Sequence, residues 1–462
     1  MSGKAKGAAI IKDFTVGSIP KQLLRFSVPF ILSNVLQLVY SLVDMAVVGR
    51  FVGSSGLSAV STASQLCNFL TMLCVGFASG GQVYISQLIG AGRKDELNRT
   101  IGTLFTSIVG ICLLMMGVSL LSHRGVLDLL NTPKEAYDMA VDYALISTVG
   151  LIFTYGYNTV SAVLRGMGDS RHPLMFILIA SVANLVLDLI FVPVLGWSVA
   201  GAALATIVGQ AISFIFALVF LFKRRGSFGF DFRLKSLLPD QDILKTLTKV
   251  GVPFALRSGA INISMMFVSS MVNSFGVVAS AVFGTGIKID DIINKTTVSL
   301  TYSSSAMIGQ NIGAKDFGRT KKIVYWCLLF SVAAYAAFTV IYLIWGQELF
   351  GLFTDDAEVI TLAPVFISAL VWSFPAMALM RATSGFITGV GNSKLSLLFA
   401  LIDSVVLRIT LSYLIGVVFD QGLFGFFLGY GLAAYGTAIP GLLYFFFGKW
   451  ESYSLLGKKK AA

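Results

Sequence analysis

Long apolar segments constrain this chain more than any other feature. A membrane-spanning helix needs about 20 apolar residues, and the sequence contains twelve segments of at least that length. Charged residues make up 12% of the chain, against about 25% in globular proteins. We therefore predict an all-α polytopic membrane protein with twelve transmembrane helices. The predicted spans cover residues 22–49, 57–84, 97–121, 136–162, 172–194, 197–222, 248–274, 277–309, 320–346, 359–388, 395–418 and 424–448.

The distribution of Lys and Arg predicts the orientation, because cytoplasmic connections accumulate these residues. Most of the 34 Lys and Arg residues lie at the two termini and in alternate connections, whereas the opposite connections hold Arg50, Arg124 and Lys134. We therefore expect a multi-pass protein of the plasma membrane with both termini in the cytoplasm. The basic residues are scattered rather than gathered on one segment, which favours a lipid bilayer and not nucleic acid as the partner.

Two motifs recur at a constant offset along the chain. QLIGAGRKD (87–95) returns as QNIGAKD (310–316), and RGMGDSR (165–171) returns as TGVGNSK (388–394). The chain is therefore an internal duplication. Each half contains six spans, an even number, so the two six-helix repeats are parallel.

The duplication predicts two lobes joined by a basic connection. We expect a first lobe over residues 1–225, a cytoplasmic linker over 226–247 and a second lobe over 248–462. Two such lobes are how many secondary transporters build a central cavity that opens alternately to either side of the membrane.

Polar side chains inside the first-lobe spans indicate a functional site. An Asp at the centre of a membrane helix costs about 2.5–3.5 kcal/mol, and intramembrane carboxylates are functional candidates by default. Asn184 and Asp188 stack one helical turn apart on the fifth span, whose other side chains are almost all apolar. Oxygen donors suit a hard cation such as Na⁺, and the carboxylates also suit a proton. We predict cation or proton coupling, including a possible Na⁺ site, at Asp44, Asn184, Asp188 and Thr206, supported by Gln37, Tyr143 and Asn158.

Several of these residues also have a plainer interpretation. Thr206 can bond to its own helix, and Tyr143 and Asn158 can be ordinary hydrogen-bond partners between helices.

The eighth span is unusually charged. Lys288, Asp291 and Lys295 have the spacing to pair along one helix face, whereas Asp290 points about 100° away. Asp290 either faces a cavity and attracts cations or lies at the solvated end of a long helix.

Charges in other second-lobe spans need partners. Asp403 and Arg408 are five residues apart and are not neighbours on an α-helix. We therefore expect Arg381 or Arg257 to neutralise Asp403. The candidates for the substrate cavity are Asp290, Arg381 and Asp403.

In combination, the motifs resemble those of the multidrug and toxic compound extrusion (MATE) transporters of the MOP superfamily. They are P-x-x-x-S-N…VDMAVVGRFVGSSGLSAVS (29–61), the GAGRKD turn and RGMGDSR, and the resemblance covers essentially the whole chain. It implies export of amphipathic, often cationic, organic compounds in exchange for H⁺ or Na⁺. We expect a monomer that binds a small organic substrate and needs no cofactor beyond the coupling ion.

The resemblance also bears on the branch of the family. Asn184-x-x-x-Asp188 followed by Thr206, with Asp44 on the first span, is similar to the amino-terminal-lobe cation site of the DinF-like branch. The NorM-like branch relies on carboxylates in its seventh and tenth spans, and the corresponding spans here, 248–274 and 359–388, contain no Asp or Glu.

Two other functions remain as alternatives. A lipid-linked oligosaccharide flippase would need a wide basic cavity, to which Arg257, Arg381 and Arg408 could contribute. An enzyme is disfavoured, because the two histidines, His123 and His172, both lie near span ends and no catalytic constellation accompanies them.

Overall fold

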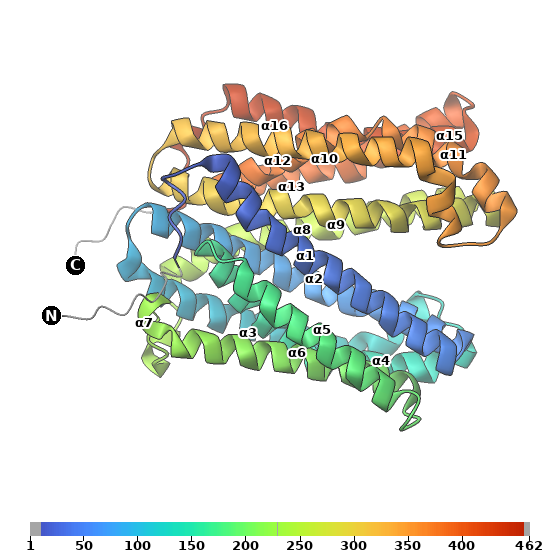
Figure 1. The fold of residues 1–462 in the computed structure, drawn as a ribbon, viewed down its shortest axis with the longest axis horizontal. Coiled ribbons are helices and arrows are strands. Elements are labelled where there is room, and N and C mark those ends of the chain that lie inside the picture. Colours follow the sequence, from blue (N-terminus) through green and yellow to red (C-terminus); the bar gives the residue numbers. More distant parts are fainter. Residues whose placement is uncertain (1–10, 229, 457–462) are drawn as a thin grey trace. The chain divides into compact units, whose positions relative to one another are not determined.

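The computed structural model describes residues 11–228 and 230–456, and every regular element in these ranges is helical (Figure 1). A helix satisfies its own backbone hydrogen bonds, which hydrocarbon cannot do for it. The long helices of the first half are α1 (Ile19–Phe51), α2 (Ser54–Gly90), α3 (Leu97–Leu129), α4 (Lys134–Gly166), α5 (Arg171–Phe191) and α6 (Ser198–Lys223). Short helices in the connections are η1 (Lys94–Glu96), α7 (Arg225–Phe228) and η2 (Leu234–Leu237).

The second half repeats this order with more interruptions. Its helices are α8 (Gln241–Asn273), α9 (Val277–Gly313), α10 (Phe317–Gly351), α11 (Ala357–Val371), α12 (Phe374–Val390), α13 (Ser393–Leu401), α14 (Ile409–Tyr413), α15 (Gly422–Leu432) and α16 (Tyr435–Phe447). Two π-helical segments, η3 (Ile402–Arg408) and η4 (Leu414–Val418), flank α14, and the 3₁₀ helix η5 (Trp450–Ser452) follows α16.

The described helices confirm the multi-span, all-helical fold. Ten of them are long and apolar enough to cross a membrane, and the bent pair α11 and α12, which meet at 48°, forms an eleventh candidate. Helix α9 is as long as α2, its repeat partner, at 37 residues, but it carries the charged stretch that starts at Lys288.

The described chain divides into two compact units. One contains the described residues up to Val16 together with Leu32–Gly251, and the other contains Gly17–Ile31 and the described residues from Val252 onward. We call them the first and second lobe. Helices α1 and α8 therefore each contribute to both lobes, and each has a proline near the point of division, Pro29 or Pro253.

Each lobe has its own packing order. In the first lobe α4 packs against α2, α3 and α6, and α6 also packs against α5. In the second lobe α9 packs against α10, α11 and α12, while α15 packs against α11, α14 and η4.

One pair of hydrogen bonds shows the duplication at atomic detail. The Ser213 hydroxyl donates to the carbonyl oxygen of Phe176 at 3.0 Å in the first lobe. The Thr437 hydroxyl donates to the carbonyl oxygen of Phe399 at 3.1 Å in the second. The second-lobe segment between these partners is one residue longer, and it contains the two π-helical turns, which widen a helix to hold an extra residue.

Candidate functional site

The predicted coupling residues of the first lobe come from three helices. Asp44 lies on α1, Asn184 and Asp188 lie on α5, and Thr206 lies on α6. Exposure is 7% for Asp44, 4% for Asn184 and 1% for Asp188, so all three are buried. Asp188 lies near enough to Asp44 for the two carboxylates to interact electrostatically.

A small pocket opens beside these residues. Its volume is about 10 Å³, room for about one water-sized particle, and it is lined by Tyr40, Ala180, Ser181, Asn184, Thr206, Gly209 and Gln210. Asp44 and Asp188 do not line it. The Asn184 amide donates to the Thr206 hydroxyl at 3.3 Å, which joins α5 to α6 across the pocket. Gly209 permits this close approach, because a Cβ there would lie 3.0 Å from the carbonyl oxygen of Ala180. Thr206 therefore serves as a partner between helices.

The site presents oxygen atoms that lack hydrogen-bond donors. Oδ1 of Asp44, Oδ1 of Asn184 and both carboxylate oxygens of Asp188 are enclosed, and none has a donor at hydrogen-bond distance. The Asn184 side chain is a neighbour of the Asp188 carboxylate, beyond that distance. Such atoms are costly in a protein interior unless a proton or a cation satisfies them. Within residues 11–228 and 230–456 no three His, Cys, Asp or Glu side chains gather as metal ligands. The arrangement thus offers two carboxylates, an amide and a hydroxyl, a donor set for Na⁺ or H⁺.

The three predicted supporting residues have different surroundings. Tyr143 is buried on α4 and interacts electrostatically with both Asp44 and Tyr40. Gln37 is half-buried on α1. Asn158 donates its amide to the carbonyl oxygen of Thr154, one turn earlier on its own helix, at 2.8 Å. The structure therefore connects Tyr143 to the carboxylates, while the Asn158 amide bonds within α4.

Tyr40 and Gln210 are among the pocket residues that the predicted site did not include. Tyr40 is one turn before Asp44, and Gln210 is one turn after Thr206, with its side-chain oxygen enclosed and unbonded. Both follow the i, i+4 spacing that places side chains on one helix face. That spacing was the signal that could have found them.

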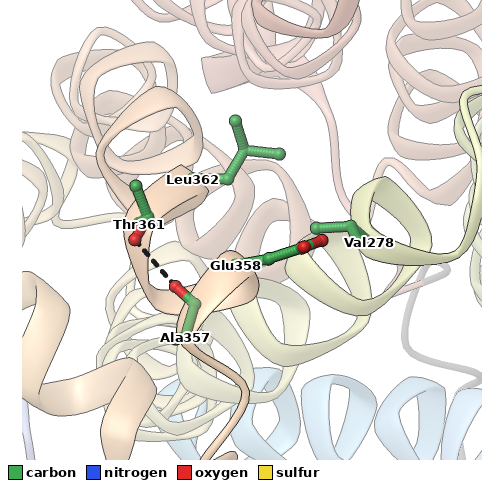
Figure 2. Close-up of a pocket in the computed structure, with 5 residues that line it drawn as sticks. All are labelled: Val278, Ala357, Glu358, Thr361 and Leu362. Carbon is green, nitrogen blue, oxygen red and sulfur yellow. Dashed lines mark hydrogen bonds between the residues drawn. The ribbon is translucent and has the colours of Figure 1, made fainter.

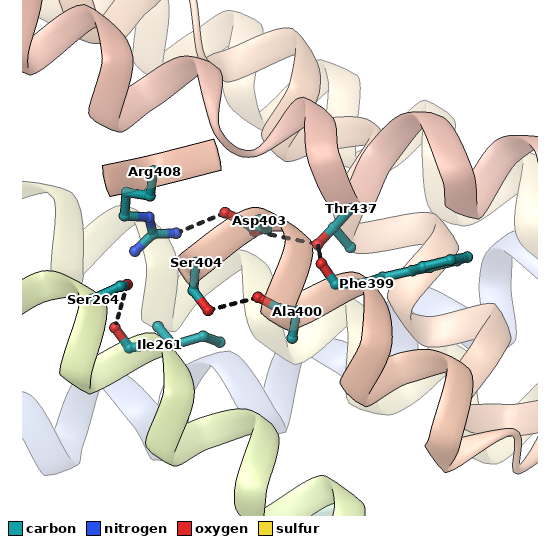
Figure 3. A network of polar contacts seen from close by, with 8 residues as sticks. All are labelled: Ile261, Ser264, Phe399, Ala400, Asp403, Ser404, Arg408 and Thr437. Atoms are coloured by element: carbon teal, nitrogen blue, oxygen red, sulfur yellow. Dashed lines mark hydrogen bonds and ion pairs between the residues drawn. The ribbon is translucent and has the colours of Figure 1, made fainter. Parts of the chain in front are cut away.

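The ion pair of Asp403 corrects a prediction. Arg408 donates to Asp403 at 3.1 Å, and Thr437 donates to the other carboxylate oxygen at 3.2 Å (Figure 3). The ion-pair partner of Asp403 is therefore Arg408, and not Arg381 or Arg257 as expected; Arg257 interacts with Asp403 electrostatically without forming an ion pair. The physical reason is the π-helix η3, in which backbone bonds run from i to i+5 and residues five apart come together.

Arg381 has its own partners on α9 and α10. It is 7% exposed and donates to the Asn294 side-chain oxygen at 2.5 Å and to the Tyr335 hydroxyl at 3.3 Å. Arg257 donates to the Ser396 hydroxyl at 3.0 Å. The predicted contact between Asp291 and Lys295 has support, because the two charges interact electrostatically.

Asp290 lies in the interior of the second lobe. It is 5% exposed in the middle of α9, so its interpretation as the solvated end of a helix is wrong. Its Oδ1 atom is enclosed and has no hydrogen-bond donor.

A separate hollow lies on the surface of the second lobe. Figure 2 shows Val278 of α9 facing Glu358 of α11, with Thr361 bonded to the carbonyl oxygen of Ala357. Glu358 is exposed, and the hollow includes none of the predicted site residues.

Buried carboxylates inside duplicated helical lobes define the class of a secondary membrane transporter. The MatE family model matches residues 29–190 and again 253–414, one copy in each half. The chain belongs to this family. It is a MATE transporter that works by cation-coupled antiport, and it is not an enzyme.

Relatives resemble the chain over nearly its full length. It is 27% identical to the probable multidrug resistance protein YpnP of Bacillus subtilis, over 97% of this chain and 99% of that protein. It is 23% identical to the probable multidrug resistance protein NorM of Thermotoga maritima, covering 96% of both. A solved structure, an outward-facing multidrug resistance MATE transporter of the MOP superfamily, matches with a TM-score of 0.88 at 22% identity, covering 96% of this chain and 98% of that chain.

Proposed function

We propose that this transporter exports amphipathic, cationic organic compounds in exchange for H⁺ or Na⁺, and that the exchange is coupled at Asp44, Asn184, Asp188 and Thr206. The observation that carries the proposal is the set of enclosed oxygens around the first-lobe pocket that lack hydrogen-bond donors. A small cation or a proton satisfies those oxygens, and its loss leaves charge repulsion between Asp44 and Asp188. Binding or loss of that cation or proton therefore changes the free energy of the first lobe. The multidrug names of the YpnP and NorM relatives support the substrate class.

The position of the site supports a finer placement in the family. Its acidic residues lie on α1 and α5, whereas the span segments 248–274 and 359–388 contain no Asp or Glu. We propose on this ground that the chain works like the DinF-like branch. Tyr143 would orient the carboxylates through its electrostatic contact with Asp44, with Gln37 and Asn158 as further polar groups of the first lobe.

The charge pattern supports a proposal on orientation in the membrane, and the duplication supports one on movement of the two halves. We propose that both termini and the linker 226–247 are cytoplasmic, and that the lobes 1–225 and 248–462 alternate access in a monomer of the plasma membrane. Cysteines placed in the linker and near Lys134 should be labelled from opposite sides of sealed vesicles.

The second-lobe charges stay candidates for contact with substrate. Asp290, Arg381 and Asp403 are the charges that a bound molecule would meet there. The arginines do not favour a flippase, because Arg257, Arg381 and Arg408 are engaged by Ser396, Asn294 and Asp403.

The test is efflux from proteoliposomes, with a cationic dye as substrate and a proton or Na⁺ gradient imposed separately. Asp44→Asn should remove gradient-driven efflux while leaving folded protein in the membrane. Asp355→Asn is the matched control, because it makes the same change in an exposed loop between α10 and α11. Unchanged coupling in Asp44→Asn would refute the assignment, and the gradient that drives the wild type names the ion.

A further inference from the structure

The Asp290 carboxyl is a buried acidic group that first-lobe coupling does not use. It belongs to α9, and its helix neighbours Ile289 and Ile293 are part of an apolar cluster that also contains Tyr342 and Tyr430. The Tyr342 hydroxyl is enclosed and, like Oδ1 of Asp290, has no hydrogen-bond partner. Two polar groups that interact electrostatically are therefore both unsatisfied in one apolar region.

Charged and titratable groups of α9, α10, α12, η3 and α15 interact with Asp290. Arg381 of α12 and Arg408 of η3 attract its negative charge, and Asp291 on the same helix repels it. Tyr342 of α10 and Tyr430 of α15 interact with it as well. Among the described residues neither guanidinium group forms an ion pair with Asp290; Arg381 donates to Asn294, and Arg408 pairs with Asp403.

These surroundings select the kind of ligand that Asp290 can take. Na⁺ needs several oxygen donors, and two guanidinium groups close by repel a metal ion. A proton needs only one carboxylate oxygen. The enclosed Oδ1 atom of Asp290 has no hydrogen-bond donor, and a bound proton satisfies such an atom. Arg381 and Arg408 attract the carboxylate that remains when the proton leaves.

We propose that Asp290 is a second proton-exchanging group of the transporter, located in the second lobe, with the Tyr342 hydroxyl as its polar neighbour. Uptake forms one O–H bond on the carboxylate and release breaks it, with water as the source and acceptor of the proton. The idea rests on the proposed function, because it adds a proton to each cycle of an ion-coupled exporter.

The first lobe has no equivalent of this group. When the two halves are aligned on Gly90 and Gly313, Cys67 lies at the position of Asp290 and Ser119 at the position of Tyr342. Ser119 is satisfied by a hydrogen bond of 2.8 Å to Thr148. Asp290 and Tyr342 therefore belong to the second lobe alone and are not a copy of the first-lobe site.

The first experiment is infrared difference spectroscopy of the purified full-length protein during a pH titration. In an Asp44→Asn, Asp188→Asn background, which removes the first-lobe carboxyls, the protein should show the carbonyl band of a buried protonated carboxyl group, and adding Asp290→Asn should remove that band. Asp291→Asn, which changes the exposed neighbour on α9, should keep it. Asp290→Glu should retain a shifted band, and Tyr342→Phe should shift the band without removing it. These two variants carry the test if Asp290→Asn does not fold.

The second experiment counts protons per dye molecule from the reversal potential in proteoliposomes. Asp290→Asn should lower the wild-type ratio by one, and Asp291→Asn should leave it unchanged. An infrared band that survives the addition of Asp290→Asn to the first-lobe double variant, or an unchanged ratio, overturns the idea. If the wild type itself shows no gradient-driven efflux, the proposed function fails, and the infrared band still decides whether Asp290 exchanges a proton.

Discussion

The two lobes share one arrangement of helices but carry different side chains at equivalent positions. Counted back from the matching residues Ser213 and Thr437, Asn184 corresponds to Arg408 and Thr206 to Tyr430. In the first lobe the Asn184 amide bonds to Thr206, beside two carboxylates. In the second lobe the Arg408 guanidinium lies 5.0 Å from the centre of the Tyr430 ring.

The second lobe has a permanent positive charge on Arg408, whereas the first lobe has carboxylates that can bind and release a cation or a proton. Arg408 is a cation built into the chain, and Asp403 neutralises it. The first lobe has the acidic oxygens of Asp44 and Asp188, which have no basic side chain bonded to them. A duplicated helical frame can thus keep its packing while the positions of Asn184 and Thr206 suit a mobile ion in one copy and the equivalent positions hold a fixed cation in the other.

The largest expected effect comes from giving the first lobe a neutral interior. Asp188→Asn should abolish gradient-driven efflux, because both carboxylate oxygens are enclosed and their charge is what a coupling ion would bind. Transport in proteoliposomes measures this, with Asp355→Asn as the control. Retained coupling would mean that the two lobes do not differ in ion exchange.

A large loss of stability should follow from converting the second lobe to the first-lobe residue. Arg408→Asn leaves Asp403 buried without its charge partner, and breaking a buried pair in this way costs about 3–5 kcal/mol. Adding Asp403→Ala should recover most of the loss, and alanine is the residue at the equivalent position, Ala180, when the lobes are counted forward from Phe176 and Phe399. Thermal unfolding in detergent reads out both variants, and a double variant no more stable than the single one contradicts the comparison.

A moderate effect is expected where α6 approaches α5. Gly209→Ala places a Cβ 3.0 Å from the carbonyl oxygen of Ala180 and 3.2 Å from Cβ of Asn184. Overpacking of this kind costs about 1–3 kcal/mol. It should also weaken coupling by separating Asn184 from Thr206. Gly117→Ala on α3 is the control, because a Cβ there meets nothing within 4 Å. Equal unfolding temperatures for the two variants would remove the special role of Gly209.

The smallest effect concerns the turns after α4 and α12. Burial raises the pKa of Asp169, but hydrogen bonds and the charge of His172 outweigh it, so this pKa lies below its ordinary 3.8. Asp169 therefore contributes stability above that pH and loses it as the pH falls through the lowered pKa. The second lobe has Asn392 in the same place, where its side chain accepts from the backbone N–H of Leu395. Asp169→Asn should make unfolding less sensitive to acid, and an unchanged acid dependence contradicts this role.

Much of the architecture could be predicted from local sequence patterns. Apolar length predicts the helices, and the repeated RGMGDSR and TGVGNSK turns predict the duplication. The i, i+4 spacing of Asn184 and Asp188 predicts that they share a helix face, and both are buried in the structure. The same spacing rule failed for Asp403 and Arg408, because it assumes an α-helix and the backbone there is π-helical.

The sequence by itself determined that this is a duplicated, membrane-spanning helical protein with carboxylates inside its spans. Those properties depend on the transfer cost of each residue and on periodicity, which are local. Only the tertiary structure decided that Gln210 and Tyr40 line the first-lobe pocket, that Arg408 pairs with Asp403 and that Asp290 is enclosed. These depend on which helix faces meet and on an extra residue absorbed by a π-helical turn, and both are outcomes of packing between distant segments.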